Sequence, residues 1–116
     1  MKDLRKFYVD GEWVDPIFAN DLAVENPATE ELVATISMGA MADVNRAVAA
    51  AKHAFPSYSR TSVDERIALL ENLLSIYSDR YDEMAVAISI EMGAPISFST
   101  TAQADCGRGH INAALE

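Results

Sequence analysis

The spacing of apolar residues changes once along this chain, near residue 40. Before that point, short runs of aromatic and β-branched residues are separated by turn residues, as is typical of strands. They predict two β-hairpins within residues 6–36. Asp10-Gly11, which suits a type I′ turn, closes the first hairpin, and the Asn-Pro-Ala-Thr-Glu segment at residues 26–30 closes the second. We expect no strands after residue 40.

Four helices are predicted in the rest of the chain, because apolar residues recur there every three or four positions. Pro56 is expected to end the first helix, since proline cannot donate the next backbone hydrogen bond. Ser62 and Glu65 have the spacing of a capping box at the start of the second. The predicted helices cover residues 41–55, 62–78, 79–92 and 97–116.

The last two helices differ in how well their ends are specified. Asp79 is expected in the first turn of the third helix, where the helix dipole favours a carboxylate, and Gly93 with Pro95 ends that helix. The fourth helix is weaker, because Gly107 and Gly109 each cost about 1 kcal/mol in a helix interior. No Gly, Asn or Pro follows its last apolar residues, Ala114 and Leu115, to close the helix. Short hairpins also need other elements to pack on, so we expect an incomplete domain that continues in a longer protein.

Composition and charge exclude several classes of function for this chain. The 116 residues carry a net charge of -9 with the basic residues scattered, which argues against nucleic-acid binding. No apolar run approaches the roughly 20 residues of a membrane span, and the N-terminus lacks the apolar segment of a secretory signal. The single cysteine excludes an intramolecular disulfide. We expect a cytoplasmic protein without membrane or nucleic-acid partners.

Cys106 is the one candidate thiol nucleophile. A catalytic thiol needs a base or a helix N-terminus to form thiolate, and its neighbours Asp105 and Arg108 carry opposite charges. His110, one helical turn later, could act as a base or form a metal-binding pair with Cys106. Three interpretations stay open: a nucleophile, a metal ligand, and a helix cysteine. The last is favoured, because free cysteine usually behaves as a small hydrophobe.

A second motif, at residues 107–112, comes close to the dinucleotide pattern G-x-G-x-x-G, with Asn112 in the third glycine position. That pattern binds pyrophosphate only where it joins a strand to a helix. No strand is predicted before it, and Asp105 would repel phosphate. We therefore interpret Gly107 and Gly109 as positions where helices pack closely. The residues alone predict neither a catalytic nor a cofactor-binding site.

Five stretches nevertheless follow one another in a recognisable order: FYVDGEWV, VENPATEELVATI, ADVNRAVAAAKHAF, SRTSVDERIALLENLLSIY and AISIEMGAPI. Together they resemble the N-terminal portion of the NAD(P)-dependent aldehyde dehydrogenases, from Phe7 to about Ala114. The turn that begins at Asn26 and the helix stop from Glu91 to Pro95 carry most of the specificity.

The resemblance implies an α/β parent fold with a Rossmann-type cofactor domain, a catalytic domain and a small strand domain for oligomerisation. Residues 1–116 would be an incomplete N-terminal part of the cofactor domain. The parent reaction oxidises an aldehyde to a carboxylic acid with NAD or NADP. The family's catalytic and main cofactor-binding motifs lie downstream, and Cys106 does not match its nucleophile. The resemblance implies that this chain alone would be inactive. Its partners would be the rest of its own enzyme chain and further copies in a homo-oligomer.

The same resemblance implies a site for a monovalent cation. Its matching positions are Val24 and Glu25, before the Asn-Pro turn, and Glu91, before the Gly93 stop. Main-chain oxygens and a carboxylate suit a hard cation. This chain departs from the family at Glu30, where many members have Gly, and a positive φ there would cost a non-glycine residue about 1 kcal/mol.

Two alternatives stay open. The chain could be a stand-alone helical module, derived from such an enzyme, that uses its apolar helix faces for oligomerisation or partner binding. It could also be a small metal or thiol protein centred on Cys106 and His110. A defined, concentration-dependent oligomer would favour the first, and metal content that depends on Cys106 the second.

Overall fold

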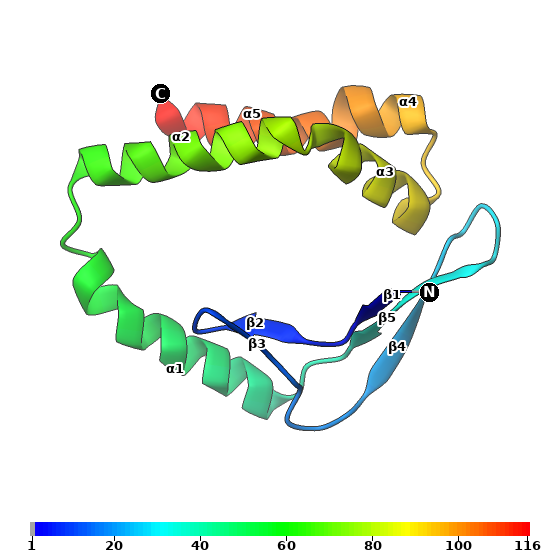
Figure 1. Ribbon diagram of the computed structural model, residues 1–116, viewed down its shortest axis with the longest axis horizontal. Helices are drawn as coiled ribbons and strands as arrows, with labels where there is room; N and C mark the ends of the chain where they lie inside the picture. The colour runs from blue at the N-terminus through cyan, green and yellow to red at the C-terminus, as the bar shows by residue number, and fades with distance from the viewer. Residues whose placement is uncertain (1) are drawn as a thin grey trace. The chain divides into compact units, whose positions relative to one another are not determined.

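The computed structural model describes residues 2–116, which form short strands followed by helices (Figure 1). The chain divides into two compact units. The first contains residues up to Glu25 and from Glu31 to Arg60, and the second contains Asn26–Glu30 and Thr61–Glu116. The predicted fold class, an α/β segment in which two hairpins precede about four helices, is confirmed.

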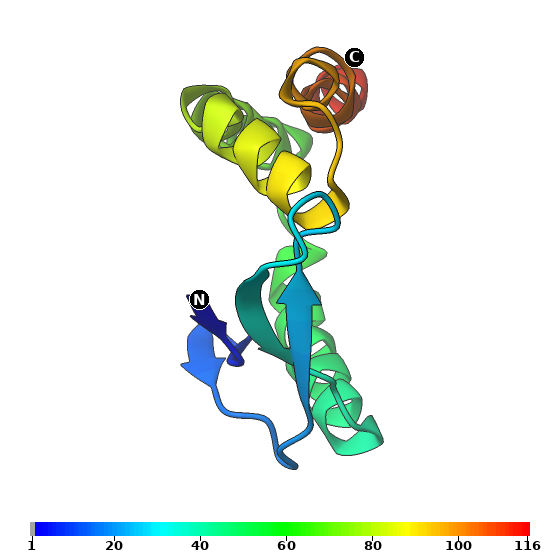
Figure 2. The same ribbon diagram turned by 90° about the vertical axis from the view of Figure 1, so that its right-hand side faces the viewer.

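Both predicted hairpins are present, and their strands lie in the first unit. Strands β2 (Phe7–Val9) and β3 (Glu12–Val14) pair antiparallel. Asp10 and Gly11 between them have φ of 56° and 81°, the positive values that a type I′ turn requires. Strands β4 (Asp21–Glu25) and β5 (Leu32–Ser37) form the second antiparallel pair and lie side by side in Figure 2.

A further strand, β1 (Lys2–Leu4), was not predicted from the sequence. It pairs in parallel with β5, so that the larger sheet has the strand order β1-β5-β4. All three of its residues are exposed, and therefore no alternation of apolar and polar positions marks the strand. Its pairing comes from backbone hydrogen bonds along the edge of β5, which the residue types do not reveal.

Helix α1 (Met41–Tyr58) runs three residues past the predicted end, with Pro56 inside it. Proline lacks an amide donor, but in the last turn it removes only one helical bond. The Ser57 hydroxyl donates to the carbonyl of Ala54, and the Ser59 amide donates to that of Phe55. These bonds close the helix beyond the proline, so the proline does not end it.

The second unit begins with helices α2 (Val63–Asp79) and α3 (Tyr81–Met92), which meet at Arg80. The predicted capping box is present: the Ser62 amide donates to a Glu65 carboxylate oxygen at 2.6 Å, and the Glu65 amide donates to the Ser62 hydroxyl. Asp79 is the last residue of α2, so its predicted place in the first turn of the third helix was wrong.

The last helical segment is not one regular helix. Helix α4 (Ile96–Phe98) leads into a π-helical turn, η1 (Ser99–Gln103), and then into α5 (Ala104–Leu115). The Ala104 amide donates to the Ser99 carbonyl five residues earlier, the spacing that defines a π turn. In Figure 1, α5 runs alongside α2 in the opposite direction.

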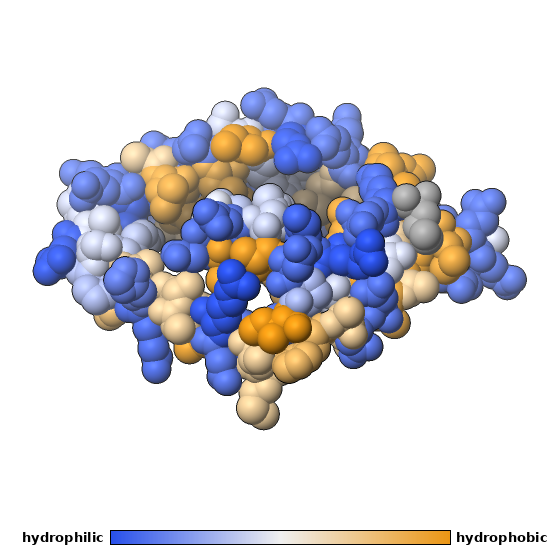
Figure 3. Space-filling view, turned by 60° about the horizontal axis from the view of Figure 1, so that its bottom comes forward, coloured by the Kyte–Doolittle hydropathy of each residue, from blue (hydrophilic) through white to orange (hydrophobic). Residues whose placement is uncertain are grey.

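The described residues bury few apolar side chains. In residues 2–116 the buried apolar residues are three alanines: Ala34, Ala85 and Ala104. Larger apolar side chains are half-buried or exposed, and Figure 3 shows hydrophobic (orange) residues reaching the surface among hydrophilic (blue) ones. Full burial of a Leu, Ile or Phe side chain normally stabilises a fold by about 1.5–3 kcal/mol. Most of that stabilisation is missing here.

None of the helices in residues 2–116 combines the length and apolarity needed to cross a membrane.

Candidate functional site

The two most specific motifs of the sequence meet in the second unit. At the tip of the β4–β5 hairpin, the Asn26 carbonyl accepts bonds from the amides of Thr29 and Glu30, and its side chain accepts one from Ala28. Gly93 ends α3 with a φ of 67°. A Cβ atom on Gly93 would lie 2.8 Å from Cγ of Pro27. Glycine is therefore required at position 93 by its φ and by its contact with the tip.

The predicted cation ligands fall in both units. Val24 and Glu25 end β4 in the first unit, where a register irregularity separates them, and Glu91 lies exposed near the end of α3 in the second. No group of three or more His, Cys, Asp or Glu side chains in residues 2–116 is placed to hold a metal ion. The expected ligands are two main-chain oxygens and one carboxylate, and this set stays a prediction.

Cys106 is exposed on the first turn of α5. Arg108, the nearest cation in sequence, is already engaged, because its guanidinium pairs with the carboxylate of Asp105 and lies 4.9 Å above the ring of Tyr81. Burial raises the pKa of the Tyr81 hydroxyl above its usual value, so this tyrosine stays protonated and can donate a hydrogen bond. The group around Cys106 therefore joins α5 to α3.

The glycine motif has a packing role at one of its two positions. Gly107 and Gly109 both lie within α5, and the helical segments α4 and η1 precede them instead of a strand. A Cβ on Gly107 would come within 2.5 Å of the Tyr77 hydroxyl oxygen of α2, whereas a Cβ on Gly109 would meet nothing within 4 Å. The predicted close helix packing is confirmed at Gly107, whereas Gly109 has no neighbour within residues 2–116 that would require it.

Two tyrosines that the sequence interpretation did not single out hold the π turn in place. The Tyr81 hydroxyl donates to the carbonyl of Thr100, and the Tyr77 hydroxyl donates to that of Ala104 at 2.7 Å. Their rings pack edge to face, with centroids 6.2 Å apart. The spacing of the two tyrosines by four residues was visible in the sequence, but their acceptors, more than 15 residues away, were not.

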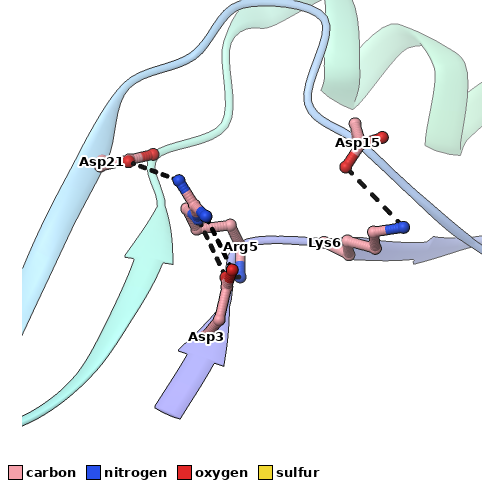
Figure 4. Close-up of polar contacts among 5 residues, drawn as sticks. All are labelled: Asp3, Arg5, Lys6, Asp15 and Asp21. Carbon is pink, nitrogen blue, oxygen red and sulfur yellow. Dashed lines mark hydrogen bonds and ion pairs between the residues drawn. The ribbon is translucent and has the colours of Figure 1, made fainter. Parts of the chain in front are cut away.

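A cluster of charged side chains lies in the first unit (Figure 4). Arg5 pairs with Asp3 at 2.7 Å and with Asp21 at 3.3 Å, and Lys6 lies 3.9 Å from Asp15. The hydrogen bond from the Arg5 side chain lowers the pKa of Asp3 to about 2.

The five charged residues of this cluster, together with Trp13, line an open hollow of about 900 Å³. All five charged side chains are exposed, and such pairs contribute little stability. Arg5 joins β1 to β4 across the sheet, a structural role.

Comparison with known proteins gives a consistent result. The model of the aldehyde dehydrogenase family matches residues 13–115. A 3-succinoylsemialdehyde-pyridine dehydrogenase from a Pseudomonas species is 46% identical over 112 residues, which are 96% of this chain and 24% of that protein.

Solved structures agree with the sequence matches. An aldehyde dehydrogenase from Bartonella henselae superposes with a TM-score of 0.94 at 46% identity, over 97% of this chain and 24% of the other. Aldehyde dehydrogenase C from Pseudomonas syringae, solved as a C291A mutant with NAD+ and octanal, gives a TM-score of 0.93 at 43% identity, over 96% and 23%. This chain thus spans about a quarter of the length of the relatives it matches.

Proposed function

Because this chain belongs to the aldehyde dehydrogenase family and corresponds to its N-terminal segment, we propose that it forms the outer part of the cofactor-binding domain of an enzyme that oxidises an aldehyde to a carboxylic acid. The observation that carries the proposal is the combination of a family match over residues 13–115 with a 24% share of the relatives' length. The segment supplies scaffold, and the reacting groups belong to the remaining three-quarters of such an enzyme.

The chemistry of the parent reaction supports this division. A thiolate attacks the aldehyde carbonyl, a hydride leaves to the nicotinamide, and water then releases the acid. Each of these steps needs groups held in fixed positions around one carbon atom. Cys106 has no such surroundings, since Arg108 beside it is engaged by Asp105 and Tyr81. Residues 1–116 alone should not turn over an aldehyde.

NAD is the cofactor we propose for the whole enzyme. The Pseudomonas syringae structure was solved with NAD+, and so was an aldehyde dehydrogenase from Mycobacterium tuberculosis that is 31% identical to this chain. We also propose a cytoplasmic location, in keeping with the single cysteine, and a homo-oligomer, which the family resemblance implies.

The monovalent cation site at Val24, Glu25 and Glu91 is part of the same proposal. The sharp Asn26-Pro27 turn directly after β4 and the Gly93 stop directly after Glu91 give both ligand segments fixed ends. In an enzyme that contains this segment, potassium ions should raise the midpoint of thermal unfolding, and Glu91→Gln should abolish that increase. An increase of equal size in the variant would contradict the site.

The stand-alone interaction module remains the second candidate. It is favoured by the exposed apolar side chains on the helices, such as Leu69, Leu73 and Val86. It predicts that the isolated chain forms a defined oligomer in light scattering, without hydrophobic-dye binding. An incomplete domain should bind the dye and aggregate.

The direct test of the first candidate is a joined protein, in which these 116 residues are followed by the remaining part of the Bartonella henselae enzyme. We expect the joined protein to reduce NAD+ in the presence of octanal or another aldehyde. The matched control carries the corresponding N-terminal segment of the Pseudomonas syringae enzyme at the same junction. An active control beside an inactive joined protein would contradict the proposal.

A further inference from the structure

The π turn between α4 and α5 changes the hydrogen bonding of one backbone carbonyl, that of Thr100. In a regular α-helix the amide of Ala104 would donate to this carbonyl, four residues earlier. Here the Ala104 amide donates to the Ser99 carbonyl instead. The Thr100 carbonyl therefore loses its helical donor, and the hydroxyl of Tyr81 in α3 donates to it. A side chain of a neighbouring helix thus replaces a bond of the helix itself.

The π turn also decides which residue of α5 lies beside Tyr77, because it contains one residue more than an α turn. Ser99, at the start of the turn, is fully buried, and Gly107, beyond it, lies against Tyr77. Without the extra residue, a helix continuing from Ser99 would place Cys106 where Gly107 lies. A Cβ at that place comes within 2.5 Å of the Tyr77 hydroxyl oxygen. The register with the π turn is the one that brings a glycine to this contact.

We propose that Tyr81 sets the register of α5. Its hydrogen bond to the Thr100 carbonyl holds the extra residue in the π turn and so keeps Gly107 beside Tyr77. Thr100 is half-buried, and a carbonyl that is kept from water and has no donor destabilises a fold. Removing the Tyr81 hydroxyl therefore favours an α turn, in which a backbone amide donates to the Thr100 carbonyl again.

The other side-chain bonds of this segment do not have that role. The hydroxyls of Thr100 and Thr101 each donate to the carbonyl four residues earlier, as threonine hydroxyls do in ordinary helices. The Tyr77 hydroxyl donates to the Ala104 carbonyl. In either register the amide four residues further along α5 is the helical donor to that carbonyl. Among these bonds, the one from Tyr81 is the bond that reaches a carbonyl deprived of its amide.

A deletion in the joined protein tests the register. Tyr81→Phe removes the hydroxyl and keeps the ring. Deleting Thr101, which is exposed, shortens the π turn to an α turn and leaves α5 in place, because the amide of Asp105 is then four residues from the Thr100 carbonyl. Tyr77→Phe is the matched control, since it also removes one tyrosine hydroxyl from the same segment. Each substitution is made with and without the deletion.

Thermal unfolding and hydrogen exchange followed by mass spectrometry measure the effects. We expect Tyr81→Phe to lower the midpoint of unfolding by roughly 2–4 °C. It should also raise the exchange rate of the amides in residues 99–104 at least about tenfold. The deletion of Thr101 should reverse most of both changes, because the Thr100 carbonyl regains an amide donor. The same deletion should not reverse the effects of Tyr77→Phe.

Three results would overturn the role of Tyr81. The first is a midpoint and exchange rate that Tyr81→Phe leaves unchanged. The second is a deletion that lowers the midpoint equally with and without Tyr81→Phe, because the two positions would then act independently. The third is an equal rescue of Tyr77→Phe, which would show that the deletion acts on something other than the Tyr81 bond. These measurements do not use catalytic activity, so their outcome is separate from that of the proposed function.

Discussion

Among single residues, Asp43 connects two segments of the first unit that lie far apart in the sequence. It is 8% exposed, and its carboxylate accepts hydrogen bonds from the amides of Ile17 and Ala40, each at 2.9 Å. It thereby caps α1 and fixes the loop that leads to β4. The bond from Ile17, followed by that from Ala40, holds the pKa of Asp43 below its ordinary value of 3.8.

This lowered pKa makes a prediction about acid stability. A carboxylate whose pKa is lower in the folded state stabilises the fold above the unfolded pKa, and this stabilisation is lost as the pH falls through the folded pKa. In the joined protein, Asp43→Asn should lower the midpoint of thermal unfolding at about pH 7. The difference from the unmodified protein should shrink as the pH falls below 3.8, the ordinary pKa, and on through the lower pKa of folded Asp43.

A control for Asp43 is Asp82→Asn, which changes an exposed residue in the first turn of α3. The control should have a smaller effect at neutral pH. A midpoint difference for Asp43→Asn that stays constant from about pH 6 to about pH 3 would show that the lost stability does not come from ionisation.

Glu30 is a second informative residue, because the family resemblance led us to expect glycine at this position. Its φ is 59°, so the hairpin tip does require the left-handed conformation that the sequence comparison suggested. The tip keeps its hydrogen bonds, since the Glu30 amide donates to the Asn26 carbonyl at 2.8 Å. The departure therefore costs local strain but does not change the turn.

Among the elements, the packing of α5 on α2 depends on one glycine of the pair in α5. Gly107→Ala should destabilise the joined protein by about 1–3 kcal/mol, because its new Cβ would clash with the ring and hydroxyl of Tyr77. Gly109→Ala is the matched control, with open space at its Cβ position. It should stabilise the helix by up to about 1 kcal/mol. Chemical denaturation of both variants measures the two changes.

A larger loss of unfolding free energy for Gly109→Ala than for Gly107→Ala would contradict this packing. If Gly109→Ala were the more destabilising, a surface outside this chain would contact Gly109, and Tyr77 would have room to move away from position 107.

The sequence predicted the elements whose signals are local. The Asp10-Gly11 turn, the Ser62–Glu65 capping box and the Gly93 stop each depend on a few neighbouring residues, and all three are present. The elements that depend on distant partners were missed. Strand β1 exists through its pairing with β5, and the π turn is held by hydroxyls from α2 and α3.

The helix end at Pro56 shows a different reason for a wrong boundary. Proline is strongly unfavourable inside a helix but tolerable in its last turn, and sequence spacing does not separate these cases. The cation site could not be predicted from the pattern of apolar residues. Its expected ligands, Val24, Glu25 and Glu91, came only from the family resemblance.

For the whole molecule, the lack of large buried side chains is the property that needs explaining. In residues 2–116 the buried apolar residues are alanines, while Trp13, Phe55 and Met41 are 68%, 65% and 80% exposed. A domain that folds alone must offset its conformational entropy with buried apolar surface. The relatives, about four times as long, have enough chain to supply that cover.

The most direct test compares the rate of NAD+ reduction with octanal for the purified 116-residue chain and for the joined protein, each verified by intact mass. We predict turnover by the joined protein and none by the chain alone. Turnover by the 116 residues alone would contradict the claim that this chain is one part of a larger catalytic unit.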